Sequence, residues 1–381
     1  MRQARWVVGA LSLGLAGCPS DPMMPPVDSG MTGDTGGADT GGVDTGMGGD
    51  TGTPQDSGGG DVRDTGMAGD TTVTPDVPGD GGMSAIPAMV SSLVSSGFSR
   101  PVDAVPTASG ATVFLLAYGN VDGVPVPTVL RRGMAGAPSV VVQGDPLAAP
   151  TGLAISNDDM RLYIADPAGT RAMDVPDDGA IYSVSTEGGM VSVVNTGGSI
   201  HNPVAVALHG DGTELTILAR DDMGVFGVFR VGTAGGTPRR LDTGGGLQSP
   251  SGLAVANDGT VYVLDTRGGG EASGTLLRVP SMGGAPMVLV SGGLIMSFPA
   301  GLALSRDGTR LLVSGFDPGN GPGVLTWVRT DGTAPDSPMP FAPMMGLLAT
   351  PSGLHRARLA DVYAIADEGS GDTGSVLLAR P

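Results

Sequence analysis

Five aspartates in or next to a repeated segment of the chain are the first candidates for chemistry. Asp166, Asp265 and Asp367 each close an apolar stretch at the end of a copy of the repeat. Asp103 stands where other copies have glycine, and Asp317 lies in a loop after a further copy. Carboxylate oxygens suit Ca2+, but no stretch has the spacing of a known calcium loop. A short carboxylate at this place more often accepts backbone N–H bonds of its own loop, so we favour capping and keep Ca2+ as the candidate cofactor.

The three histidines, His201, His209 and His355, do not form a spaced metal-binding motif. His201 precedes a repeat proline and His355 follows the Gly-Leu of the last copy, so both could approach the centre of the fold. A surface or turn position is the interpretation we favour for them. There is no Gly-x-Ser-x-Gly elbow, P-loop or Cys-x-x-Cys pair, so the catalytic residues, if there are any, are unknown from the sequence.

These residues are positioned by a repeat whose clearest copy is Pro250–Asp265, PSGLAVANDGTVYVLD. Its opening proline recurs at 101, 150, 203, 250, 299 and 351, spacings of 47 to 53 residues. Each copy has two apolar runs joined by a Gly- or Asp-containing turn, and two further runs follow it across a Gly-rich hairpin. Four short antiparallel strands every fifty residues are typical of a β-propeller blade, so the sequence predicts an all-β, six-bladed propeller over residues 85–381.

The two ends of the repeat region predict how the ring closes. The last copy stops at GSVLLARP and therefore lacks its fourth strand. The missing run stands before the first copy, where Met89–Ser95 parallels the fourth strand of the blade that starts at Pro250. We expect this N-terminal strand to pair with the last blade, because closure protects the sheet edges that open blades would expose.

The N-terminal residues 1–17 have the form of a secretory signal, with two arginines followed by about eleven apolar residues, too few for a spanning helix. The segment ends in Leu-Ala-Gly-Cys, which resembles the bacterial lipoprotein cleavage motif. This resemblance implies cleavage before Cys18, acylation of Cys18 and a membrane partner reached through the lipid. Because no aspartate follows the cysteine, the sorting pattern favours the outer membrane of the cell envelope, on its periplasmic or its exposed side.

Residues 18–84 read as a linker between the lipid and the propeller. The segment is rich in Asp, Thr, Gly and Pro and has almost no large apolar side chain, so it cannot bury enough surface to fold. Its Asp-Thr-Gly triplets lack the hydrophobic strands that a protease needs. Weak calcium binding or O-glycosylation of the threonines stays open.

The charge of the chain excludes one class of partner. The formal net charge is −18, and all 20 basic residues are arginine. A basic stripe that could neutralise phosphates is missing, so we expect no nucleic-acid partner. A single cysteine excludes an internal disulfide.

The repeat P-x-G-L-A-x-x-x-D-G-T-x-x-Y-V-x-D resembles the six-bladed propellers of the NHL-repeat and regucalcin/gluconolactonase (SGL) families. In lactonases of that group a divalent metal lies in the channel, held by a Glu of the first blade and by Asn and Asp of later blades. Here the first blade has Asp103 and no glutamate nearby, and Asn157 and Asn257 follow the first strand instead. The metal-binding set of these lactonases therefore does not transfer to this sequence.

The sequence thus predicts a lipid-anchored envelope protein that presents a non-catalytic propeller for binding or interaction. Its ligand would be an unidentified protein, glycan or small molecule. The alternative is a metal-dependent lactonase or hydrolase of the SGL type. Irregular loops carry most function on regular scaffolds, which favours the face with the loops Pro167–Gly179, Thr266–Gly274, Phe316–Gly323 and Glu368–Gly374.

Overall fold

The computed structural model describes residues 89–170, 178–195, 200–267, 274–296, 298–316, 321, 323–332, 339–340, 347–369 and 374–380. The chain divides into two compact units, Met1–Asp76 and Val77–Pro381. All described residues belong to the second unit. The predicted signal sequence, Cys18, the linker and Asp317 lie outside the described residues.

Within the described residues all regular structure is β-strand, arranged as six four-stranded antiparallel sheets. In these ranges no helix is long and apolar enough to cross a membrane. The first three sheets contain β2 (Ser99–Pro106), β3 (Thr112–Val121), β4 (Val124–Gly133), β5 (Ser139–Gln143); β6 (Gly152–Ile155), β7 (Arg161–Asp166), β8 (Ala180–Ser185), β9 (Ser192–Val193); and β10 (His201–Leu208), β11 (Glu214–Arg220), β12 (Phe226–Gly232), β13 (Arg239–Arg240). The others contain β14 (Pro250–Val255), β15 (Val261–Asp265), β16 (Gly274–Val279), β17 (Met287–Leu294); β18 (Leu302–Leu304), β19 (Arg310–Phe316), β20 (Gly323–Arg329), β21 (Met339–Pro340); and β22 (Pro351–Arg356), β23 (Tyr363–Asp367), β24 (Ser375–Arg380), β1 (Met89–Val94).

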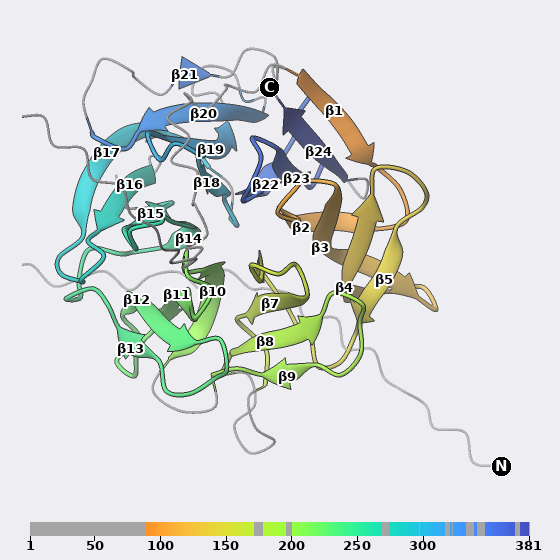
Figure 1. The fold of residues 1–381 in the computed structure, drawn as a ribbon, viewed down its shortest axis with the longest axis horizontal. Coiled ribbons are helices and arrows are strands. Elements are labelled where there is room, and N and C mark those ends of the chain that lie inside the picture. Colours follow the sequence, from red (N-terminus) through yellow and green to blue (C-terminus); the bar gives the residue numbers. More distant parts are fainter. Residues whose placement is uncertain are drawn as a thin grey trace, which may run out of the picture. The chain divides into compact units, whose positions relative to one another are not determined.

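The six sheets stand around a common axis, with the first strand of each repeat innermost (Figure 1). Each innermost strand contacts the innermost strand of the next sheet, and β22 of the last sheet contacts β2 of the first. The ring is therefore closed, and the predicted six-bladed propeller is confirmed.

The predicted closure of the ring by an N-terminal strand is also confirmed. Strand β1 pairs antiparallel with β24, with Met89 opposite Arg380 and Val94 opposite Val376. The two strands lie side by side at the outer edge of the sixth blade (Figure 1). Residues from the two ends of the propeller thus complete one sheet.

Glycine at the third place of the repeat lets the innermost strands approach one another closely. A Cβ added at Gly353 would overlap the carboxylate of Asp103 and lie 2.6 Å from its Cα. A Cβ at Gly152 would lie 3.1 Å from the Cα of Ala205 in the next blade. The small residues of the Gly-Leu-Ala segment are therefore required by backbone packing, as the sequence predicted.

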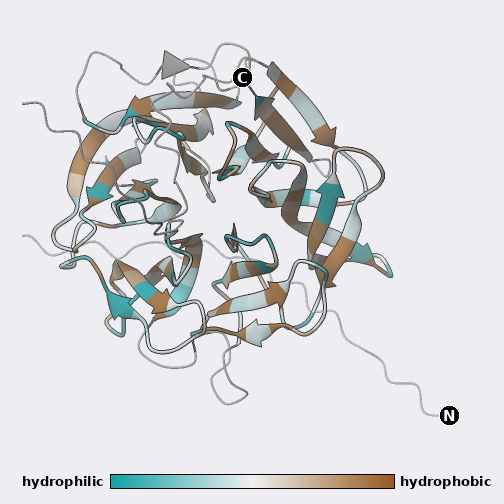
Figure 2. Cartoon of the chain, in the orientation of Figure 1, coloured by the Kyte–Doolittle hydropathy of each residue, from teal (hydrophilic) through white to brown (hydrophobic). Residues whose placement is uncertain are grey.

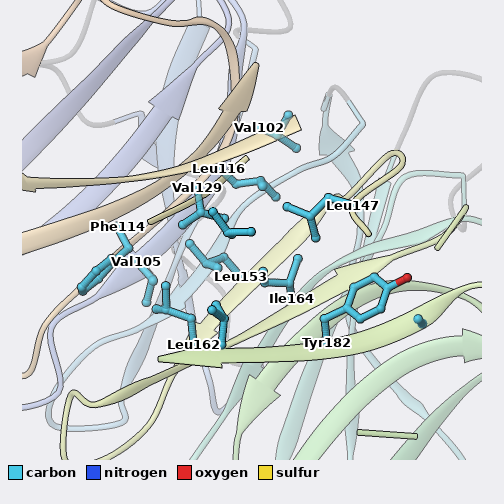
Figure 3. Packing of buried hydrophobic residues seen from close by; sticks show 13 residues of the cluster. Val102, Val105, Phe114, Leu116, Val129, Leu147, Leu153, Leu162, Ile164 and Tyr182 are labelled. Atoms are coloured by element: carbon cyan, nitrogen blue, oxygen red, sulfur yellow. The ribbon is translucent and has the colours of Figure 1, made fainter. Parts of the chain in front are cut away.

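The core lies between neighbouring blades, and the hydropathy of the strands reflects this arrangement (Figure 2). Figure 3 shows one such layer, in which Phe114 and Leu116 of β3 pack with Leu162 and Ile164 of β7 and with Tyr182 of β8. The aromatic position of the second strands is core, as expected, since its residues Phe114, Tyr163, Tyr262 and Tyr363 are all buried.

Trp327 lies in a third strand, as predicted, and its ring meets that of Tyr363 edge to face at 6.1 Å between centroids.

Candidate functional site

The three aspartates that end second strands are buried and act as caps. Asp265 accepts hydrogen bonds from the backbone N–H groups of Gln248 at 2.5 Å, Ser249 at 3.0 Å and Arg267 at 3.1 Å. It therefore joins the loop before the first strand of its blade to the loop after the second strand. This geometry is the loop capping that the sequence analysis favoured for Asp265.

The other two aspartates repeat the arrangement in their own blades. Asp166 accepts from the N–H groups of Ala148 at 2.7 Å and Ala149 at 3.0 Å, and Asp367 from that of Thr350 at 2.6 Å. Burial raises the pKa of Asp166, although these backbone hydrogen bonds oppose the rise. Each carboxylate has its acceptor sites taken up by the protein backbone.

His201 lies on the same face, at the start of β10. Its Nδ1 contacts the carboxylate of Asp178, and its Nε2 lies 2.9 Å from Oδ1 of Asp222. Both ring nitrogens of His201 therefore face carboxylates. Within the described ranges no three His, Cys, Asp or Glu side chains form a group that could hold a metal ion.

Asp103 and His355 meet on the axis of the propeller. Nε2 of His355 in β22 lies 3.1 Å from Oδ2 of Asp103 in β2, so the pair joins the last blade to the first. Asp103 is 3% exposed, and its carboxylate also accepts the N–H of Ala104 at 2.9 Å and that of Leu153 at 2.7 Å. The surface or turn position expected for His355 is wrong, because this histidine takes the channel-lining place that alanine has in most other copies.

The electrostatic state of His355 follows from this pairing. Burial by itself would lower the pKa of the imidazole, but the charge of Asp103 and its hydrogen bond outweigh burial and raise the pKa above the usual range. The imidazolium form is therefore stabilised on the axis.

A cavity of about 460 Å³ opens beside this pair, at the end of the channel where the turns between first and second strands converge. We call it the turn-face cavity. Further along the axis, at the level of the repeat glycines, only a void of about 20 Å³ remains, room for about one water molecule. Asp103 lines the small void, the polar turns line the turn-face cavity, and His355 lines both.

Polar side chains from several blades surround the turn-face cavity. They include Asn157, His209, Asn257, Arg306, Arg356 and Arg358. Arg358 reaches from the sixth blade to the second, where its Nη2 donates to the carbonyl of Asn157 at 2.9 Å. Arg356 donates to the carbonyl oxygens of Leu304 at 2.7 Å and Ala357 at 2.6 Å.

Sequence reasoning placed the ligand on the opposite face and did not nominate these arginines. One signal could have found them, since the sixth copy reads GLHRAR where Pro250 begins a copy reading GLAVAN. Three basic side chains in six residues mark this turn as different from the scaffold. The loops of the opposite face are only partly among the described residues, so a site there stays a prediction.

Comparison with known proteins agrees with the fold. Residues 179–335, from just before β8 to beyond β20, match the family model of the lipoprotein LpqB β-propeller domain, Gmad1. No curated protein matches the chain.

Among solved structures, a gluconolactonase from Xanthomonas campestris is 16% identical, with 77% of this chain and 89% of that chain covered and a TM-score of 0.51. TolB from Acinetobacter baumannii is 15% identical with a TM-score of 0.45; 61% of this chain is covered, but only 53% of the length of that protein. A TolB homologue from Agrobacterium tumefaciens is 17% identical, with 74% and 91% covered and a TM-score of 0.49. At these identities the likeness concerns the fold alone.

Proposed function

We propose that this protein is a lipid-anchored component of the cell envelope whose propeller is a non-catalytic binding module. Its ligand is a small molecule taken up by the turn-face cavity. The observation that carries this proposal is the cavity itself, a concave site on the axis that is lined by turns of several blades. Its volume of about 460 Å³ lies in the range of small-molecule sites.

The lining of the cavity supports binding more directly than it supports chemistry. Small apolar side chains form one part of the wall, and arginine, asparagine, histidine and aspartate side chains form the other part. Binding pockets combine apolar walls with polar groups that fix the orientation of a ligand. The two serines that line the cavity, Ser156 and Ser305, donate their hydroxyls to Asp158 and Asp307 of their own turns.

Two observations on the sequence support the membrane anchor. The Leu-Ala-Gly-Cys motif ends at Cys18, and the family model that matches residues 179–335 is that of a lipoprotein propeller domain. In cells, Cys18→Ala should move the protein from the membrane to the soluble fraction. A Cys18→Ala protein that still sediments with membranes would contradict the lipid anchor.

Binding is tested on the full chain by thermal shift against a collection of small polar molecules. A ligand present at about 100 times its Kd stabilises the folded state by about 2.7 kcal/mol. The variant Asn257→Trp places a large ring at the mouth of the cavity and should abolish the shift. Met282→Trp, at a position that is 94% exposed and does not line the cavity, is the matched control and should retain the shift. If no molecule of the collection gives a thermal shift that Asn257→Trp abolishes, the proposal is contradicted.

The alternative of a metal-dependent lactonase has only the fold of the gluconolactonase in its favour, and one fold carries many activities. It is tested on the same protein with simple lactones in the presence of Ca2+, Zn2+ or EDTA. Turnover that requires the metal would overturn the non-catalytic proposal.

A further inference from the structure

We infer that the turn-face cavity binds a small organic carboxylate, with its carbon skeleton against the apolar wall and its oxygens toward the basic side chains of the sixth blade. This inference rests on the proposed function, because it names the class of ligand for the same site.

The wall of the cavity has one polar member at the level of the repeat alanine. The six blades place Val105, Ala154, Ala207, Ala254, Ala303 and His355 there, and all six line the cavity. Five of these side chains offer only methyl groups. This ring of six side chains therefore suits a ligand whose short carbon skeleton packs against the methyl groups and whose polar end contacts the imidazole.

The imidazole of His355 has one nitrogen available to a ligand. Nε2 is held by the Asp103 carboxylate at 3.1 Å, and among the described residues no group bonds to Nδ1. The His355 side chain is 21% exposed, and the residue lines the cavity. Because Asp103 also raises the pKa of His355, the Nδ1–H form, a hydrogen-bond donor, is favoured.

Two arginines of the sixth blade bring positive charge without a carboxylate in contact. Within the described part of the chain, the guanidinium of Arg356 donates only to backbone carbonyls, and that of Arg358 donates only to the carbonyl of Asn157. Carbonyl dipoles satisfy hydrogen bonds but leave the net charge of each guanidinium in place. At Arg356 burial lowers the pKa of the guanidinium, and the charges of Asp361 and Asp307 partly oppose this. An anionic group is the complement of such a pair, and a carboxylate matches the arginine fork.

The carboxylates that line the same cavity are engaged within or between the turns. Asp159 accepts the N–H of Ala108 at 2.9 Å, and Asp258 accepts that of Thr260 at 2.8 Å. Asp307 accepts from the hydroxyl of Ser305 at 2.7 Å. These hydrogen bonds leave the charge of the three carboxylates in place, and the three arginines that line the cavity balance them in number. Arg358 and His355 keep donor groups for a ligand.

The apolar wall distinguishes an organic carboxylate from an inorganic oxyanion. A phosphate or sulfate ion would meet the arginines but would leave the methyl groups of the wall in contact with water. Each methylene that the wall covers should strengthen binding about fourfold. Affinity is therefore expected to rise along a series of straight-chain carboxylates.

The test is isothermal titration of the full chain at constant ionic strength with acetate, butyrate and hexanoate, with inorganic phosphate, and with hexanamide as the uncharged analogue of hexanoate. We expect hexanoate to bind more tightly than acetate and phosphate. Arg358→Gln and, separately, His355→Gln should weaken hexanoate binding about tenfold or more, because each removes a hydrogen bond to a charged group. The matched control is Arg131→Gln. This arginine of β4 pairs with Glu187 at 2.6 Å and does not line the cavity, so its substitution should leave hexanoate binding unchanged.

Three results would count against the inference, and they separate it from the proposed function. First, hexanamide could bind as tightly as hexanoate, in a way that Asn257→Trp blocks and Arg358→Gln does not affect. This result would overturn the preference for a carboxylate but leave the proposed binding site intact. Phosphate binding as tightly as hexanoate would overturn the role of the apolar wall. If no molecule of any class binds in a way that Asn257→Trp blocks, the proposed function falls together with the inference. Circular dichroism of each variant shows that the propeller has folded.

Discussion

Removing the carboxylate of Asp103 should destabilise the propeller by an amount that can be worked out from its three hydrogen bonds. In Asp103→Ala the N–H of Leu153, which is 0% exposed, loses its acceptor, and an unsatisfied buried donor costs about 1–3 kcal/mol. His355 loses a charged partner, which costs a further 1.5–3 kcal/mol or so. From these two contacts we therefore expect a loss of about 2.5–6 kcal/mol, equivalent to a fall in Tm of roughly 5–24 °C.

Asp103→Asn isolates the charge, because the amide keeps an oxygen for Leu153. The pKa of His355 is raised in the folded protein, so the stabilisation is fully present below the unfolded-state pKa of about 6.5. It is lost as the pH rises through the folded-state pKa. The difference in unfolding free energy between wild type and Asp103→Asn should therefore be largest below about pH 6.5 and shrink as the pH rises above the raised pKa of His355.

The assay is urea unfolding of the full chain, followed by tryptophan fluorescence at several pH values. Asp258→Asn, in an exposed turn, is the control and should show a small difference with no such trend. A gap between wild type and Asp103→Asn that is constant across this pH range would refute the assignment of the raised pKa to the pair. An Asp103→Ala protein that loses less than about 1 kcal/mol would refute the hydrogen-bond reasoning.

The close approach of the inner strands predicts that Gly353→Ala lowers Tm by several degrees, because overpacking costs about 1–3 kcal/mol. Gly133→Ala, whose added carbon would meet nothing nearer than 3.7 Å, should leave Tm unchanged in the same scan. Deleting residues 89–94 exposes the edge of β24, so light scattering should detect aggregation at a lower temperature; an unchanged onset would count against ring closure. Asp265→Ala removes the acceptor of three backbone N–H groups and should cost about 2–4 kcal/mol in urea unfolding, against less than about 1 kcal/mol for Asp258→Ala. Equal costs would contradict the capping role.

The architecture could be predicted from the sequence because the repeat that encodes one blade occurs six times. Proline, Gly-Leu-Ala and an Asp-Gly turn recur at a blade-like spacing, and a local pattern of this kind specifies strands and hairpins directly. The closing strand Met89–Val94 was predictable because a displaced copy of the fourth strand is visible before the first blade. Capping by Asp265 was predictable for a similar reason, since short carboxylates at strand ends meet nearby N–H groups.

The candidate site was predictable only in part. Asp103 and His355 were visible as departures from the repeat, but their contact depends on the side-chain directions of two strands that are 252 residues apart in the chain. The position of the Arg358 guanidinium depends on a carbonyl of another blade, which no spacing rule specifies. The turn that carries these arginines looked like scaffold because it stands where other blades have their Asp-Gly turn, although it lacks the Asp-Gly pair itself.

The joint between β1 and β24 also decides how the propeller responds to force. The chain upstream of Met89 is the part that would carry tension from an anchor, and Met89 pairs with Arg380, the last described residue. Tension would therefore load the hydrogen bonds of this one strand pair first, since every other blade is continuous with its neighbours through the backbone. Losing β1 would strip the outer edge of the sixth blade, the blade that carries His355 and Arg358. In an anchored protein, tension on the chain upstream of Met89 would therefore act first on the blade that carries the candidate binding site.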